Sequence, residues 1–139
     1  MNYFSIRRRI CFYETDAMGV VHHSNYLRFF EEARGAWVRS QNLDELLWKT
    51  HKIGFAVIES YVRYAKPALH NDEIEIRMQL RREGIRYRFQ YQAVNVATGE
   101  SLVTGQTVHV GLNEQFKPCR VPEQFNQIVE ASPWTETWP

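Results

Sequence analysis

The amino-acid sequence predicts an α+β domain in which an antiparallel sheet of five strands packs against one long amphipathic helix. One segment with strand periodicity is followed by one with helical periodicity and then by four more with strand periodicity. The links between the later strands are short and rich in turn residues, which favours antiparallel pairing. A length of 139 residues is typical of one domain, so we expect a single domain over residues 1–139.

The first two segments differ in period. Residues 3–12 alternate between apolar and polar, which predicts a strand, with Arg8 as the charged exception on its apolar face. The other members of that face are Phe4, Ile6, Ile10 and Phe12. Residues 24–40 have helical spacing, and Ser24 or Asn25 is expected to cap the first turn. The apolar stripe of this helix consists of Tyr26, Phe29, Phe30, Ala33, Ala36 and Trp37.

The rest of the chain completes the sheet and adds two short helices. Strands are expected over four ranges: 55–65, 73–81, 85–96 and 101–112. In the two middle ranges apolar residues alternate with charged and amide residues, so one face of the sheet is expected to be buried and the other polar. Short helices are expected over 43–50 and 123–130. Beyond them, Trp134 and Trp138 are expected to pack on their own domain or on a partner subunit.

Composition excludes several classes of protein. Seventeen basic and sixteen acidic residues give a net charge of +1, which argues against an overall basic surface that would bind the phosphate backbone of nucleic acid. No segment approaches the ~20 apolar residues of a membrane span, and arginines stand where a signal peptide would be apolar. We therefore expect no membrane span and a cytoplasmic location. The two cysteines, Cys11 and Cys119, are too few for a disulfide framework or a four-cysteine zinc site.

The segment between the first strand and the long helix, residues 13–26, carries the candidate chemistry. A helix start offers unpaired N–H groups and the positive end of the dipole, which suit a developing oxyanion. Gly19 allows close approach to a ligand, Asp16 supplies a carboxylate, and His22 and His23 supply imidazoles. Structural interpretations are also available, because Asp16 can stabilise a turn and one histidine can be an ordinary surface residue. The histidines lack ligand spacing, so no metal site is predicted.

The run from Phe12 to Arg34, FYETDAMGVVHHSNYLRFFEEAR, resembles the signature of the hot-dog thioesterases. Specifically, it is similar to the 4-hydroxybenzoyl-CoA thioesterase family, which includes the Tol-Pal-associated acyl-CoA thioesterases. Supporting matches are Gly54-Phe55-Ala56-Val57, Tyr64-x-x-Pro67-Ala68, and Lys117-Pro118-x-Arg120-x-Pro122. The resemblance covers about residues 4–122 and leaves 123–139 as a tail. It implies the hot-dog fold, a five-stranded antiparallel sheet wrapped around one long helix.

The resemblance also implies an activity and a set of site residues. The protein would hydrolyse an acyl-CoA to the free acid and coenzyme A. The family's catalytic aspartate falls on Asp16, as nucleophile or as general base for water, and its oxyanion donor falls on the backbone N–H around His23. The implied substrate-binding positions are Tyr26, Gly54, Arg86 and Arg88. Coenzyme A enters as part of the substrate, and no metal or organic cofactor is implied.

Two other functions would use the same residues. A hot-dog enoyl-thioester hydratase or dehydratase pairs an aspartate with a histidine, which Asp16 and His22 or His23 could imitate. A module that binds an acyl carrier without catalysis is the other alternative. Some hot-dog thioesterases instead use a glutamate on the helix, but the polar side of the helix accounts for Glu31 and Glu32.

Assembly is expected from the shape of the predicted domain. One helix cannot cover both faces and both edges of a five-stranded sheet, and exposed edges favour pairing. Hot-dog domains characteristically place their active sites between subunits. We therefore expect a homodimer or a homotetramer.

Overall fold

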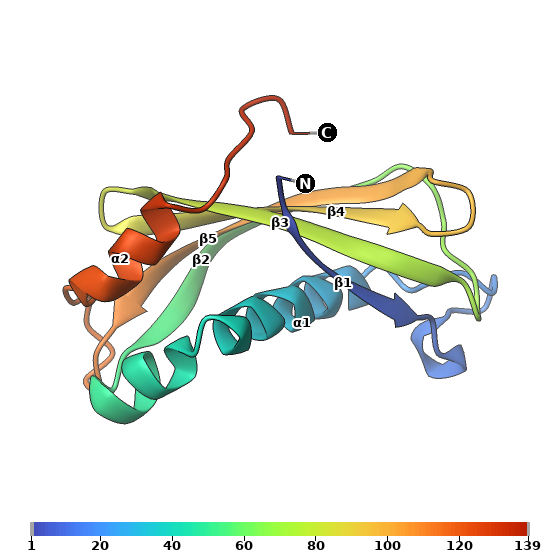
Figure 1. The fold of residues 1–139 in the computed structure, drawn as a ribbon. Coiled ribbons are helices and arrows are strands. Elements are labelled where there is room, and N and C mark those ends of the chain that lie inside the picture. The colour runs from blue at the N-terminus through green and yellow to red at the C-terminus, as the bar shows by residue number, and fades with distance from the viewer. Residues whose placement is uncertain (1, 139) are drawn as a thin grey trace.

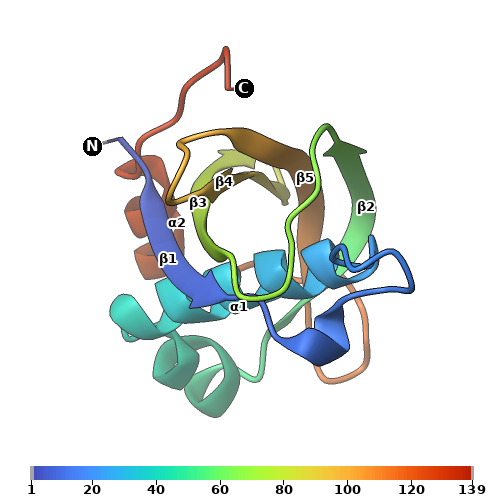
Figure 2. The same ribbon diagram turned by 90° about the vertical axis from the view of Figure 1, so that its right-hand side faces the viewer.

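The computed structural model describes residues 2–138 and contains a five-stranded antiparallel sheet that curves around a long helix (Figures 1 and 2). The order of strands in the sheet is β1-β3-β4-β5-β2. In chain order the elements are β1 (Phe4–Arg9), η1 (Phe12–Glu14), α1 (Asn25–Ser40), η2 (Glu45–Thr50), β2 (Gly54–Tyr64), β3 (Glu73–Glu83), β4 (Arg86–Asn95), β5 (Ser101–Leu112) and α2 (Glu123–Glu130). This arrangement confirms the predicted α+β class.

The first strand is shorter than the alternation over 3–12 predicts. It ends at Arg9, although the N–H of Ile10 still donates to the carbonyl of Asp72, the next position in the β1–β3 register. The 3-10 turn η1 follows at once, and the side chain of Phe12 is 75% exposed. The prediction was wrong for residues 10–12 because the backbone turns there so that Glu14 can reach Arg8.

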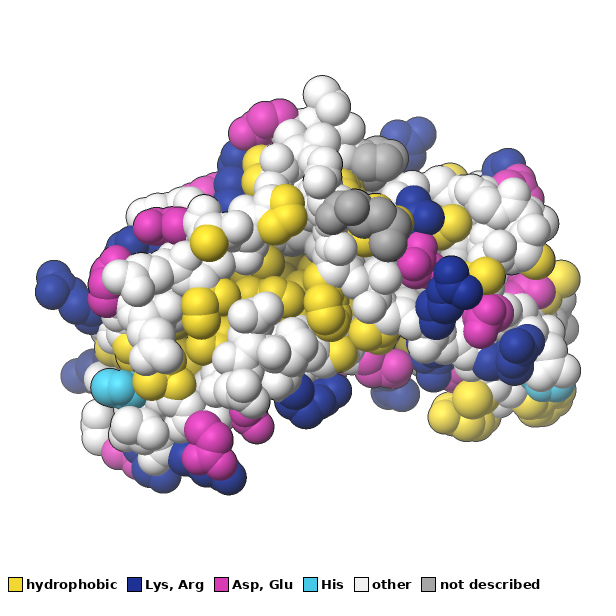
Figure 3. All heavy atoms as spheres, in the orientation of Figure 1, with side chains coloured by type: hydrophobic (Ala, Val, Ile, Leu, Met, Phe, Trp, Pro, Cys, Tyr) yellow, Lys and Arg dark blue, Asp and Glu magenta, His cyan; other side chains and the backbone are white. Residues whose placement is uncertain are grey.

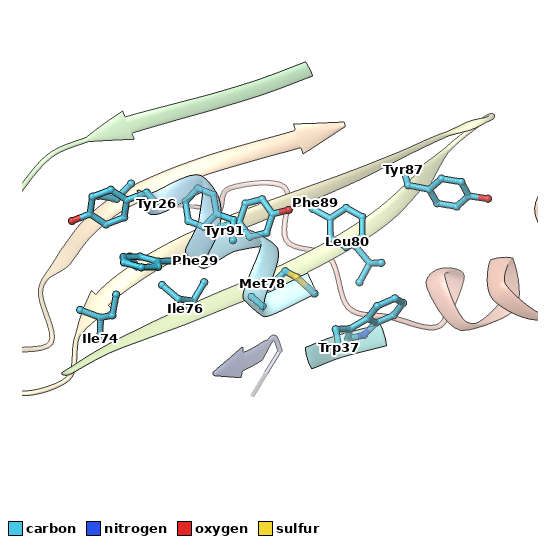
Figure 4. Packing of buried hydrophobic residues seen from close by; sticks show 14 of the residues in the cluster. Tyr26, Phe29, Trp37, Ile74, Ile76, Met78, Leu80, Tyr87, Phe89 and Tyr91 are labelled. Carbon is cyan, nitrogen blue, oxygen red and sulfur yellow. The ribbon is translucent and has the colours of Figure 1, made fainter. Parts of the chain in front are cut away.

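The core lies between α1 and the concave face of the sheet (Figure 4). The predicted stripe of α1 is buried apart from Ala36, and it packs against the predicted apolar face of β3 and β4. Phe30 stacks on Tyr91 with ring centroids 4.3 Å apart. A Cβ at Gly105 of β5 would lie only 2.6 Å from the Phe30 ring and 2.9 Å from the Tyr61 carbonyl oxygen. The absence of a side chain at Gly105 therefore allows α1 to pack this closely on the sheet.

The outer face of the sheet is polar, as predicted, but the tail covers part of it (Figure 1). Gln79 and Gln90 are each only 2% exposed. The amide oxygen of Gln79 accepts from the N–H of Thr135 at 2.7 Å. The amide nitrogen of Gln90 donates to the backbone carbonyl of Thr135 at 3.0 Å. Of the tail tryptophans, Trp134 packs under Arg81, and Trp138 packs edge-on against Tyr3. Their packing on their own domain is thus confirmed.

The outer strand β2 pairs with β5 alone, and its other edge has no partner strand within residues 2–138. The side chains along it are mostly exposed, including the large apolar ones: Val57, Ile58, Tyr61 and Tyr64. Apolar side chains also reach the surface between α2 and β1, over α1 (Figure 3). Within residues 2–138, no helix combines the length and the apolar character that crossing a bilayer requires.

Candidate active site

A cavity of about 310 Å³ lies beside the start of α1, where the loop after β1 meets the connection from β2 to β3. These segments gather at the right-hand end of the molecule in Figure 1. Its lining includes three residues that the sequence singled out, Asp16, His23 and Tyr26. Tyr64, the last residue of β2, and Lys66, in the connection from β2 to β3, also line this cavity.

The backbone holds the loop in place through a short hairpin. The N–H of Asp16 donates to the carbonyl of Val20, and the N–H of Gly19 donates back to the carbonyl of Asp16. Gly19 has φ of 79°, in the left-handed region that favours glycine. At the far end of the hairpin, the N–H of Val21 donates to the carbonyl of Ala68 at 2.9 Å. The loop is thereby fixed against the β2–β3 connection.

Glu14 anchors the same loop from beneath. Its backbone carbonyl accepts both from the N–H of His22 at 2.9 Å and from the side-chain amide of Asn25 at 2.8 Å. Its carboxylate accepts a two-pronged bond from the Arg8 guanidinium at 2.7 and 2.8 Å and another from the N–H of Cys11. The Arg8 guanidinium also lies over the ring of Phe29. The one charged residue on the apolar face of β1 is thus the partner of a buried carboxylate.

The environment of Glu14 changes its acidity. Burial raises the pKa of Glu14, but the hydrogen bonds from Arg8 and Cys11 and the positive charge of Arg8 outweigh it. The net result is a Glu14 pKa below its ordinary value. Glu14 is therefore ionised at neutral pH, and the ion pair is present under ordinary conditions.

Asp16 is half-buried and uses only part of its hydrogen-bonding capacity. Its Oδ1 accepts from the N–H of Met18 at 2.9 Å, which is the turn-stabilising bond that the sequence allowed. Its Oδ2 has no donor among residues 2–138. One oxygen orients the carboxylate, and the other is free to meet water or substrate.

The start of α1 presents an unused donor at His23. The backbone N–H of His23 makes no hydrogen bond to the described part of the chain. The prediction that Ser24 or Asn25 caps this helix through its side chain was wrong. Ser24 pairs with the imidazole of His22 at 2.8 Å, and the Asn25 amide is used on Glu14. The free His23 N–H directly precedes the first turn and lies at the positive end of the helix dipole.

Two tyrosines form the wall beside His23. Tyr26 is buried, and its burial raises the pKa of the phenol to about 12, so it stays neutral. The Tyr64 hydroxyl donates to the backbone carbonyl of His23 at 3.3 Å, and its ring packs edge-on against Tyr26. Lys66, nearby, pairs with Glu100. The sequence did not single out Tyr64 or Lys66 as site residues, although Tyr64-x-x-Pro67 supported the family resemblance.

The other expected substrate residues lie at the opposite end of the sheet. Gly54 pairs with Leu112 and Arg86 with Val110, whereas Tyr64 pairs with Val103. Nine residues of strand separate Val103 from Leu112, or about 30 Å. Arg86 pairs with Glu59 at 3.4 Å. Arg88 binds Glu83 and Gln106. Their role in binding substrate stays a prediction.

Metal ligands do not gather in this site. Across residues 2–138, no three His, Cys, Asp or Glu side chains are grouped closely enough to hold a metal ion together. His22 and His23 stack on each other with centroids 4.3 Å apart. What the site offers is one free carboxylate oxygen and one free backbone donor beside a cavity.

Comparison with known proteins identifies the family. Residues 10–129 match the sequence profile of the Thioesterase-like superfamily. The chain is 36% identical over 127 residues to a putative esterase of Aquifex aeolicus, covering 91% of this chain and 98% of that protein. It is 28% identical over 125 residues to the acyl-CoA thioesterase YbgC of Haemophilus influenzae, covering 88% and 91% of the two chains.

A solved structure supports the fold. The 1,4-dihydroxy-2-naphthoyl-CoA thioesterase of Synechocystis superposes with a TM-score of 0.84 over 93% of this chain and 96% of that one. At 19% identity this likeness concerns the fold alone. Together with the profile match over most of the chain, it shows that the protein belongs to the thioesterase-like superfamily and is a hot-dog thioesterase.

Proposed function

We propose that this thioester hydrolase cleaves acyl-CoA at the cavity beside the start of α1, with Asp16 as the catalytic carboxylate and the backbone N–H of His23 as the oxyanion donor. One observation carries the proposal: the free Oδ2 of Asp16 and the free N–H of His23 belong to residues that line the same cavity. The names of the relatives support acyl-CoA as the substrate class.

Both available routes balance with one water molecule. As general base, Asp16 takes a proton from water while the water oxygen attacks the thioester carbonyl carbon. The His23 N–H donates to the oxyanion, the C–S bond breaks, and the departing thiolate takes up the proton. As nucleophile, Asp16 attacks the carbonyl itself, releases the thiolate and leaves a mixed anhydride that water hydrolyses. A thiolate leaves readily, so neither route needs a strong general acid.

Thiol release from a panel of acyl-CoAs tests the proposal directly. The panel contains short aliphatic, long aliphatic and aromatic acyl groups, and free coenzyme A is followed with a thiol reagent. We expect at least one member to release thiol in a saturable, protein-dependent manner. If a folded sample hydrates an enoyl-CoA and releases no thiol from any member, the hydratase alternative replaces this proposal.

We also propose that the free edge of β2 pairs with β2 of a second copy. Antiparallel pairing of two identical strands places the start of one beside the end of the other. Gly54 of the second copy would then lie near Tyr64 and His23 of the first. This arrangement would bring the expected acyl-binding residue Gly54 of one copy to the catalytic loop of the other. Within a single chain, Gly54 lies about 30 Å from the end of the sheet that carries this loop.

Placing charge on this edge tests the assembly. The double variant Ile58→Lys/Tyr61→Lys sets like charges across the pairing edge, so we expect a dimer to become a monomer in sedimentation analysis. Ile85→Lys, at an exposed apolar position in the β3–β4 turn, is the matched control and should leave assembly unchanged. A wild-type monomer at micromolar concentration, or an unaltered dimer in the double variant, would contradict this interface.

A further inference from the structure

The cavity beside the start of α1 holds an ammonium group as well as a carboxylate. Among the described residues that line it, Asp16 is the only carboxylate and Lys66 is the only lysine or arginine. Hydrolysis of a thioester at Asp16 creates a second negative charge in this cavity, on the departing sulfur. Because like charges repel at short range, a cation in the same cavity favours that step.

The backbone of Lys66 is held at the end of β2. The carbonyl of Leu102, at the start of β5, accepts from the N–H of Ala65 at 2.9 Å and from the N–H of Lys66 at 3.0 Å. Pro67 follows and favours an extended backbone at Lys66. The sheet therefore fixes the point beside the cavity from which the Lys66 side chain extends.

The side chain of Lys66 is tethered, but its donors are not used up. Its ammonium group donates to the carboxylate of Glu100, in the link between β4 and β5. This link and the connection from β2 to β3 both lie at the right-hand end of the molecule in Figure 1. An ammonium group has three donors, and residues 2–138 provide an acceptor for one of them. The other two are available to a ligand in the cavity.

The ion pair keeps both of its charges at neutral pH. The hydrogen bond from Lys66, together with its positive charge, lowers the pKa of Glu100 below its ordinary value. Both side chains are about half exposed, so the pair contributes little to stability. Its structural consequence is that the ammonium group of Lys66 stays beside the cavity.

The departing sulfur needs a partner that the other lining residues do not supply. The N–H of His23 is assigned to the oxyanion, and the hydroxyl of Tyr64 donates to the His23 carbonyl. The side chains of Val20, Val21 and Val103 have no polar atoms. Lys66 has both the charge and the free donors that a thiolate requires.

We propose that the ammonium group of Lys66 stabilises the thiolate that leaves the acyl-CoA. This inference rests on the proposed function and extends it to the leaving group. As the C–S bond breaks, its electron pair moves onto sulfur, and an N–H of Lys66 donates to the sulfur anion. In the general-base route, the proton that Asp16 took from water then moves to sulfur. In the nucleophile route, the water that hydrolyses the anhydride supplies this proton, so Lys66 keeps its own protons in both.

Varying the leaving group of the substrate tests this role. The acyl group that the wild type hydrolyses best is joined to coenzyme A, to pantetheine or to thiophenol. Pantetheine lacks the nucleotide phosphates, and thiophenol gives a less basic thiolate that departs with less help. The readout is kcat/KM, which includes C–S cleavage in both routes. We expect Lys66→Met to lower kcat/KM about tenfold or more for the two alkyl thioesters and less than about threefold for the aryl thioester.

Two further variants separate the charge of Lys66 from the ion pair and from the fold. Lys66→Arg keeps a cation and should retain more kcat/KM for the alkyl thioesters than Lys66→Met does. Glu100→Gln removes the same ion pair but keeps the ammonium group, so its kcat/KM should stay within about threefold of the wild type for all three thioesters. A thermal melt of each variant checks that it is folded.

The alternatives give different patterns. Equal losses for alkyl and aryl thioesters in Lys66→Met, or an equal loss in Glu100→Gln, would assign Lys66 a structural role and overturn the proposal. A loss confined to the coenzyme A thioester would assign Lys66 to the phosphates and overturn it too. Full activity in Asp16→Asn would remove the chemistry from Asp16 but leave the leaving-group comparison intact. Thiol release from none of the thioesters would overturn both proposals together, so the two failures are distinguishable.

Discussion

Replacing Asp16 by Asn is expected to lower kcat for thiol release at least ~100-fold, with little change in thermal stability. The amide of Asn keeps an oxygen for the N–H of Met18, so the turn that Oδ1 stabilises should survive. What it loses is the negative charge on the oxygen that has no partner in the described chain. Neither proton abstraction from water nor attack on a thioester is then possible. The measurement is steady-state release of coenzyme A, paired with a thermal melt.

His23→Ala is the matched comparison for Asp16→Asn. The proposed oxyanion donor at this position is the backbone N–H, which alanine retains. The His23 ring is exposed, and its aromatic neighbours within residues 2–138 are the rings of His22 and Tyr64. We therefore expect His23→Ala to keep kcat within about tenfold of the wild type. Full activity in Asp16→Asn would remove the chemistry from Asp16, and an equal loss in His23→Ala would assign it to the imidazole.

Replacing Glu14 by Ala is expected to cost about 3 kcal/mol of unfolding free energy, because it leaves the Arg8 guanidinium without its buried partner. Arg8 keeps its bond to Glu32 at 3.1 Å. The expected loss of unfolding free energy is therefore at the lower end of the range for a broken buried ion pair. The N–H of Cys11 also loses its acceptor. The measurement is urea denaturation at pH 7. Glu31→Ala, on the exposed side of α1, is the control and should change stability by less than about 0.5 kcal/mol.

The same carboxylate predicts a pH dependence of stability. The pKa of Glu14 is lower in the folded chain than in the unfolded one, so its ionisation favours folding. This contribution is fully present above the ordinary glutamate pKa of about 4.3 and is lost as the pH falls through the lower, folded-state pKa. Glu14→Gln should therefore reduce the fall in unfolding free energy below about pH 4.3. Parallel pH profiles for the wild type and Glu14→Gln would contradict this assignment.

Local patterns were enough to predict most of the secondary structure. Alternation along β3 and β4 predicted which side of the sheet is buried, because strand period and burial are both properties of neighbouring residues. The same patterns failed at residues 10–12, where the bond from Arg8 to Glu14 favours a turn over a strand. They also gave no indication that the tail would bury Gln79 and Gln90, since Thr135 lies more than forty residues further along the chain.

The sequence by itself determined the α+β class, the boundaries of α1 and the later strands to within a few residues, and the loop that carries Asp16 and His23. Each of these depends on spacing within one short segment. Only the tertiary structure decided that the His23 N–H is left without an acceptor in the described chain, because contacts with distant residues such as Ala68 fix the path of the loop. It likewise decided that Asp16 and Lys66 line one cavity, since the approach of distant residues depends on how helix and sheet pack.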